Sequence, residues 1–87
     1  MIKKAYTLYA AKYGNIAQMI KAIEELAELQ KAIAKYLNGQ GEQIFIIEEI
    51  ADVEIMTSQL KLMFDCENQV EKFKKKKIKR MINRINQ

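Results

Sequence analysis

FIIEEIADVEIM, residues 45–56, is a predominantly apolar segment that nevertheless contains Glu49 and Asp52. It is apolar enough that we predict a helix buried on most of its sides. Residues three apart leave the same face of a helix, so these two carboxylates can share one hard cation. An ionised carboxylate taken out of water costs on the order of several kcal/mol, which a metal, a cationic side chain or a shifted pKa has to offset. We therefore expect a functional site on this helix.

A second acidic pair, Glu25 and Glu28, has the same spacing on another predicted helix, and Glu24 precedes it. These glutamates lie well away from the apolar stripe of their helix. Glutamates in that position usually form a solvated face. Taken alone, this pair could therefore be an ordinary solvent-exposed surface. The stripe consists of Ile16, Met19, Ile20, Ile23, Leu26, Ala27, Ile33, Ala34 and Leu37.

The whole chain, residues 1–87, is typical of a single all-α domain. There is no proline, and the three glycines lie where helices would need to end. Asn68 with Glu71 resembles a capping box that opens the last helix. Apolar spacings of three and four predict four helices, at about 2–13, 16–37, 43–64 and 68–85.

The composition limits which metal ions the chain can bind and which compartment it suits. Cys66 is the only cysteine and there is no histidine, so we expect a reducing, cytoplasmic setting and a metal held by oxygen ligands. Oxygen ligands favour Mg²⁺, with Mn²⁺ as a substitute. No stretch approaches the roughly 18–20 apolar residues that span a bilayer, so no membrane partner is expected.

Charge is distributed unevenly along the chain. Residues 1–67 carry seven Lys/Arg against ten Asp/Glu, whereas residues 68–87 carry eight against one. The C-terminal helix is therefore suited to anions.

The length of the chain indicates self-association. A lone core in 87 residues gives only about 3–5 kcal/mol of stability. A helix at 43–64 that is apolar nearly all round needs a further surface to cover it. We therefore expect a homodimer or homotetramer.

Glu24-Glu25-Leu26-Ala27-Glu28, followed after twenty residues by Glu49-Ile50-Ala51-Asp52, resembles the signature of the MazG-type all-α nucleoside triphosphate pyrophosphatases. The resemblance extends to Gln18 and Lys21 upstream and to residues 77–81 near the end. It is strongest to the short MazG-like proteins of Gram-positive bacteria and their phages. The fold it implies is a four-helix bundle completed by oligomerisation.

The resemblance implies Mg²⁺-dependent hydrolysis of (deoxy)nucleoside triphosphates to the monophosphate and pyrophosphate, as in house-cleaning of the nucleotide pool. Carried over by position, the implied metal ligands are Glu25, Glu28, Glu49 and Asp52. Glu24 matches the first glutamate of the motif and would orient Glu28 or help to activate water.

The resemblance also implies residues that bind the substrate. Lys77 and Arg80 match basic positions of the family, and Arg84, four residues after Arg80, is also in reach of phosphate oxygens. Lys77 is expected to face the packed side of its helix. Gln18 and Lys21 would lie at the rim of the substrate pocket.

Two other functions remain open on the sequence. The first is a non-catalytic helical oligomer or adaptor with a degenerate metal site, in which the carboxylates pair with lysines. The second is a nucleic-acid-binding module built on the basic tail. The second is weaker, because it leaves Glu49 and Asp52 unexplained.

Overall fold

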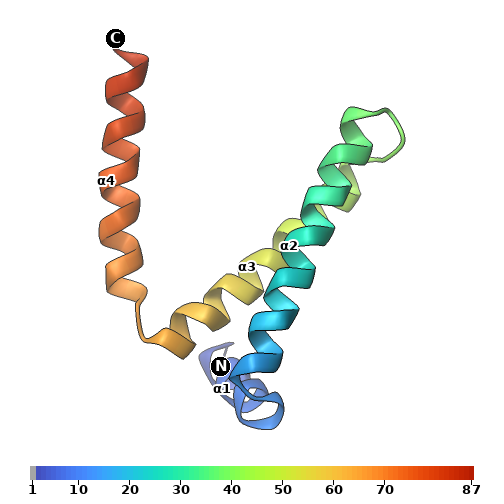
Figure 1. The fold of residues 1–87 in the computed structure, drawn as a ribbon, viewed down its shortest axis with the longest axis vertical. Helices are drawn as coiled ribbons and strands as arrows, with labels where there is room; N and C mark the ends of the chain where they lie inside the picture. The colour runs from blue at the N-terminus through green and yellow to red at the C-terminus, as the bar shows by residue number, and fades with distance from the viewer. Residues whose placement is uncertain (1) are drawn as a thin grey trace.

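The computed structural model describes residues 2–87, which form four helices and no strand (Figure 1). The all-α prediction is confirmed, and the predicted helix ends agree with the observed ones to within one residue. The helices are α1 (Ile2–Tyr13), α2 (Asn15–Leu37), α3 (Gln43–Phe64) and α4 (Glu67–Ile85).

The breaks between helices occur where the backbone leaves the helical region. Gly14 and Gly39 have φ of 83° and 72°, which glycine adopts without a steric penalty. Asp65 ends α3 in the left-handed conformation, with φ of 49°. The predicted break after Phe64 is confirmed, but α4 starts one residue earlier than predicted, and Cys66 is its N-cap without a side-chain capping bond. The predicted capping box of Asn68 with Glu71 is wrong; Glu71 instead pairs with Lys74 at 3.4 Å.

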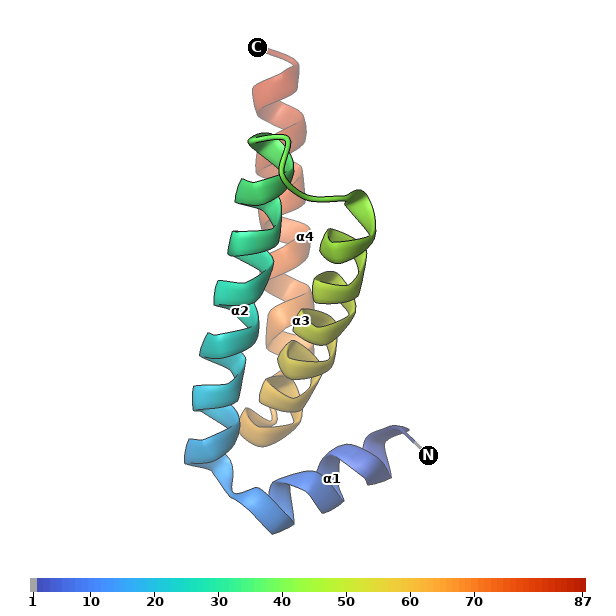
Figure 2. The same ribbon diagram turned by 90° about the vertical axis from the view of Figure 1, so that its right-hand side faces the viewer.

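The core of the fold is an antiparallel hairpin of α2 and α3 (Figure 2). Helix α1 crosses the open end of this hairpin, and α4 leaves the end of α3, touches no other helix in residues 2–87, and extends away (Figure 1). The radius of gyration is 15.9 Å, whereas a compact chain of this length has about 12 Å. One chain therefore does not close a four-helix bundle.

The side of α2 that packs on α3 is not its apolar stripe. The buried and half-buried residues of α2 on this side alternate at spacings of four and three residues. They are Gln18, Ala22, Glu25, Leu29 and Ala32, and most of them are small or polar. Helix α3 faces them with Ile46, Glu49, Val53, Met56, Gln59, Leu60 and Met63. We call this contact the α2–α3 seam; small side chains such as Ala22, which is 4% exposed, let the two helices approach closely.

The predicted apolar stripe of α2 is instead largely solvent-exposed, with Ile16 at 72% and Ile23 at 67%. In α3, Phe45, Ile47 and Ile55 are exposed as well, so a single chain buries this helix on one side and not on most sides. The accessible surface is 7450 Å², roughly 2,000 Å² more than a compact protein of this mass exposes. Within residues 2–87, no helix is both long enough and apolar enough to cross a membrane.

Candidate metal centre

Three carboxylates meet halfway along the α2–α3 seam. Glu25 comes from α2, and Glu49 and Asp52 come from consecutive turns of α3. One oxygen of each lies within 4.8 Å of the others. They meet because Glu25 occupies a seam position of α2, and the antiparallel pairing sets it beside the turn of α3 that runs from Glu49 to Asp52. Three of the four predicted metal ligands are thus brought together.

Glu49 is the carboxylate that the protein solvates least well. Its Oε2 atom has essentially no exposed surface and no hydrogen-bond partner in the described part of the chain. The pKa of Glu49 is raised, mainly by desolvation and further by the charges of Asp52, Glu25 and Glu28. A cation between these groups would relieve both effects, and the donor set is the one that hard divalent ions prefer. The residues present therefore fit Mg²⁺ or Mn²⁺.

Glu28 lies one turn beyond the cluster of three. It lines a cavity that also touches Glu49, and its charge contributes to the raised pKa of Glu49. Glu28 is therefore near the centre, although its oxygens are not within the 4.8 Å group.

Lys21 lies on the opposite side of the cluster, one turn before Glu25. Its Nζ is 3.2 Å from a Glu25 oxygen and 3.8 Å from a Glu24 oxygen. The hydrogen bond and charge of Glu25, followed by the charge of Glu24, raise the pKa of Lys21. Glu24 is largely exposed and is directed to Lys21, so it does not enter the carboxylate cluster.

Gln18 is buried in the seam, 2% exposed, with its Nε2 atom unpaired in the described residues. Gln59 of α3, which was not among the predicted site residues, is 6% exposed, and its Oε1 has no partner in the described residues either. Each lies seven residues from a cluster carboxylate, Gln18 from Glu25 and Gln59 from Asp52. The spacing of Gln59, three residues after Met56 and ten after Glu49 on the same face of α3, was the signal that would have placed it in the seam.

The predicted phosphate-binding residues Lys77, Arg80 and Arg84 are exposed on α4. Since α4 contacts only α3 among the described helices, a single chain does not bring these cations to the carboxylates (Figure 1). Lys77, expected on the packed side of its helix, is exposed like most of its neighbours.

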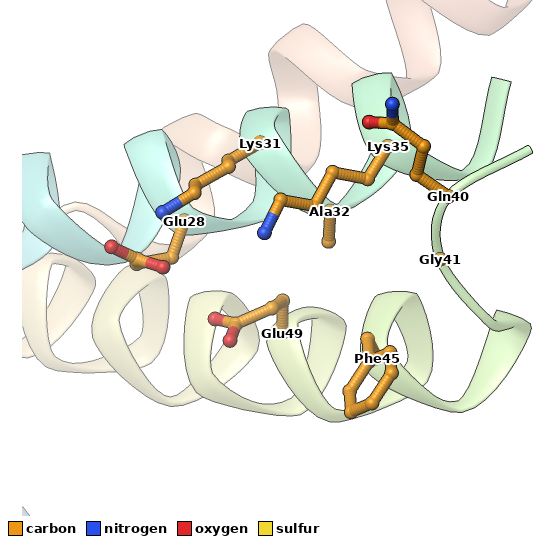
Figure 3. A pocket seen from close by; sticks show the side chains of 8 residues that line it. All are labelled: Glu28, Lys31, Ala32, Lys35, Gln40, Gly41, Phe45 and Glu49. Carbon is orange, nitrogen blue, oxygen red and sulfur yellow. The ribbon is translucent and has the colours of Figure 1, made fainter. Parts of the chain in front are cut away.

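A cavity of about 250 Å³ adjoins the carboxylate cluster between α2, α3 and the loop that joins them. Two of its lining residues are lysines that the sequence analysis did not select, Lys31 and Lys35 of α2, and Phe45 of α3 forms part of the opposite wall (Figure 3). Lys31 and Lys35 lie three and seven residues after Glu28, so helical spacing alone sets all three on one face.

Comparison with protein-family models, with curated proteins and with solved structures finds no match to this chain. The resemblance to the MazG type thus rests on the motif residues, and the activity it implies is a proposal.

Proposed function

We propose that this chain is a Mg²⁺-dependent nucleoside triphosphate pyrophosphohydrolase of the MazG type. The observation that carries the proposal is the convergence of Glu25, Glu49 and Asp52 within 4.8 Å across two helices. The unpaired, buried Oε2 of Glu49 adds to it, because a carboxylate oxygen without a partner is costly unless a cation binds there.

In this proposal Glu25, Glu49 and Asp52 hold the metal, and Glu28 supplies a fourth carboxylate from the adjoining cavity wall. Bound Mg²⁺ would neutralise phosphate charge and lower the pKa of the attacking water. Water attacks the α-phosphorus, the bond from that phosphorus to the bridging oxygen breaks, and pyrophosphate leaves. Glu28, whose oxygens lie outside the cluster of three, can accept the proton from water, whereas Glu24, which pairs with Lys21, is assigned this role only by its match to the motif.

We further propose that the active form is a homo-oligomer. The surplus of roughly 2,000 Å² of accessible surface exceeds the approximately 800 Å² per partner that a standard protein interface buries. A second copy that covers the apolar stripe of α2 would also supply an α4 helix, and with it the cations Lys77, Arg80 and Arg84, to a neighbouring centre.

One observation favours the non-catalytic adaptor as a second candidate. Lys21 already pairs with Glu25 at 3.2 Å, so an ammonium group partly neutralises the cluster without a metal. The adaptor function predicts that Mg²⁺ leaves the stability of the protein unchanged.

The test is pyrophosphate release from a panel of ribo- and deoxyribonucleoside triphosphates, with and without Mg²⁺. Wild type should release pyrophosphate and monophosphate only with Mg²⁺, and Glu49→Gln should lose the activity. Glu54→Gln is a matched control, because it makes the same change at an exposed site of the same helix. If wild type releases nothing from any nucleotide and Mg²⁺ does not change its melting temperature, the enzyme proposal fails and the adaptor stands.

A further inference from the structure

We propose that the cavity beside the carboxylate cluster is a polyphosphate subsite, in which Lys31 and Lys35 bind the phosphate chain of the substrate. The inference rests on the proposed function, since it names the phosphate ligands of that same centre. It assigns this role to lysines of α2 in the same chain, in addition to the cations of α4.

The two lysines face the cavity from neighbouring turns of α2. Figure 3 shows the ammonium of Lys35 directed into the space between α2 and α3 and that of Lys31 directed toward Glu28. Glu28 and Glu49 line the end of the cavity next to the metal centre, and Gln40 and Gly41 of the connecting loop line the other end. A phosphate chain that starts at the metal would therefore extend past both ammonium groups.

The charges of the cavity suit a polyanion once a metal is bound. Neither Lys31 nor Lys35 forms an ion pair within residues 2–87, in contrast to Lys21. Their two positive charges balance those of Glu28 and Glu49 in the free protein. A divalent ion would then balance the other two acids of the centre, Glu25 and Asp52, so that the centre no longer repels a polyanion and the two ammonium groups can bind phosphate oxygens.

The volume of the cavity indicates which part of a nucleotide it takes. About 250 Å³ is below the roughly 300–1,000 Å³ of pockets that enclose a whole drug-sized ligand. The cavity is thus suited to a phosphate chain, and the nucleoside would lie outside it. Phe45, which is 53% exposed, is the aromatic side chain among the lining residues against which a base outside the cavity could stack.

The test is isothermal titration calorimetry of the full-length protein with tripolyphosphate, in the presence and absence of Mn²⁺. The variant is the double substitution Lys31→Gln with Lys35→Gln. The control is Lys72→Gln with Lys76→Gln, which removes two charges with the same spacing from exposed positions of α4. Glutamine and lysine have similar helix propensity, so both variants should fold.

We expect tripolyphosphate affinity to fall at least about tenfold in the Lys31/Lys35 variant and less than about threefold in the control. Equal losses, a larger loss in the control, or no binding by wild type under either condition would overturn the subsite. Titration with Mn²⁺ alone tests the metal centre, and so distinguishes a failure of the proposed function from a failure of the phosphate subsite. If wild type binds no Mn²⁺, the metal centre fails, whereas the titrations without metal still decide whether Lys31 and Lys35 bind phosphate.

Discussion

Replacing Ile23 by lysine should dissociate the proposed homo-oligomer without unfolding the hairpin. Ile23 lies near the middle of the apolar stripe of α2 and is 67% exposed in the single chain. It is outside the α2–α3 seam, so the substitution leaves the contacts within the chain intact. A charged side chain at this place is compatible with water but not with an apolar interface.

The size of the effect follows from the exposed fraction. Burying a whole isoleucine side chain stabilises by about 1.5–3 kcal/mol, so burying the exposed two thirds contributes about 1–2 kcal/mol. In a two-fold symmetric dimer each substitution acts twice, which gives about 2–4 kcal/mol. The dimer dissociation constant should therefore rise by about 30-fold to 1,000-fold, before any cost of burying the lysine.

Sedimentation equilibrium over a range of protein concentrations measures this constant directly. Ile85→Lys is the control, since Ile85 is even more exposed, at 79%, but lies at the last residue of α4. A wild-type protein that remains monomeric at every concentration would refute the reasoning. Equal dissociation constants for wild type and Ile23→Lys would show that the interface lies elsewhere.

Three further predictions concern the α2–α3 seam. Because the pKa of Glu49 is raised, its contribution to stability is fully present below its ordinary value of 4.5 and is lost as pH rises through the folded value. The Tm of Glu49→Gln minus the Tm of wild type, both measured in EDTA, should thus be larger at about pH 8 than at about pH 5. A Tm difference that does not change with pH would contradict this. With Mg²⁺ a hundredfold above its Kd, wild type should gain about 2.7 kcal/mol, or roughly 10–20 °C in Tm, and Asp52→Asn should lose most of that gain in a thermal melt. Gln18→Met should raise the free energy of unfolding in urea by about 1 kcal/mol, since it removes a buried donor without a partner; a decrease would mean that the donor is satisfied.

The helices themselves could be predicted from the sequence, because their ends are set locally. The glycines interrupt the chain at 14 and 39–41, and the absence of proline allows each apolar stretch to continue as one helix. The break between α3 and α4 was predicted, but the start of α4 was predicted one residue late, because the N-cap is Cys66 and the expected capping box at Asn68 does not form.

The face that α2 turns toward α3 was harder to predict. Hydrophobicity alone predicts that α2 packs on α3 through the stripe around Ile20 and Ile23. The observed seam instead uses an adjacent face of α2, which contains Ala22 and Glu25. The expectation that Glu24, Glu25 and Glu28 form one solvated face is correct for Glu24 and Glu28 but not for Glu25, which is half-buried. A single sequence cannot separate two stripes when one packs within the chain and the other remains exposed.

The composition of the seam links folding, metal binding and assembly. The only apolar residues that a single chain fully buries among residues 2–87 are Ala22 and Met56, and the same seam contains three carboxylates within 4.8 Å. Such a seam is poorly suited to hold two helices together, because repulsion among the acids opposes the small apolar gain. In the proposed assembly a cation at the cluster would remove the repulsion, and a second copy on the exposed stripe would supply the missing apolar burial. Since both stabilise the same arrangement of α2 and α3, each should strengthen the other, and the metal centre is expected to be fully formed only in the assembled protein.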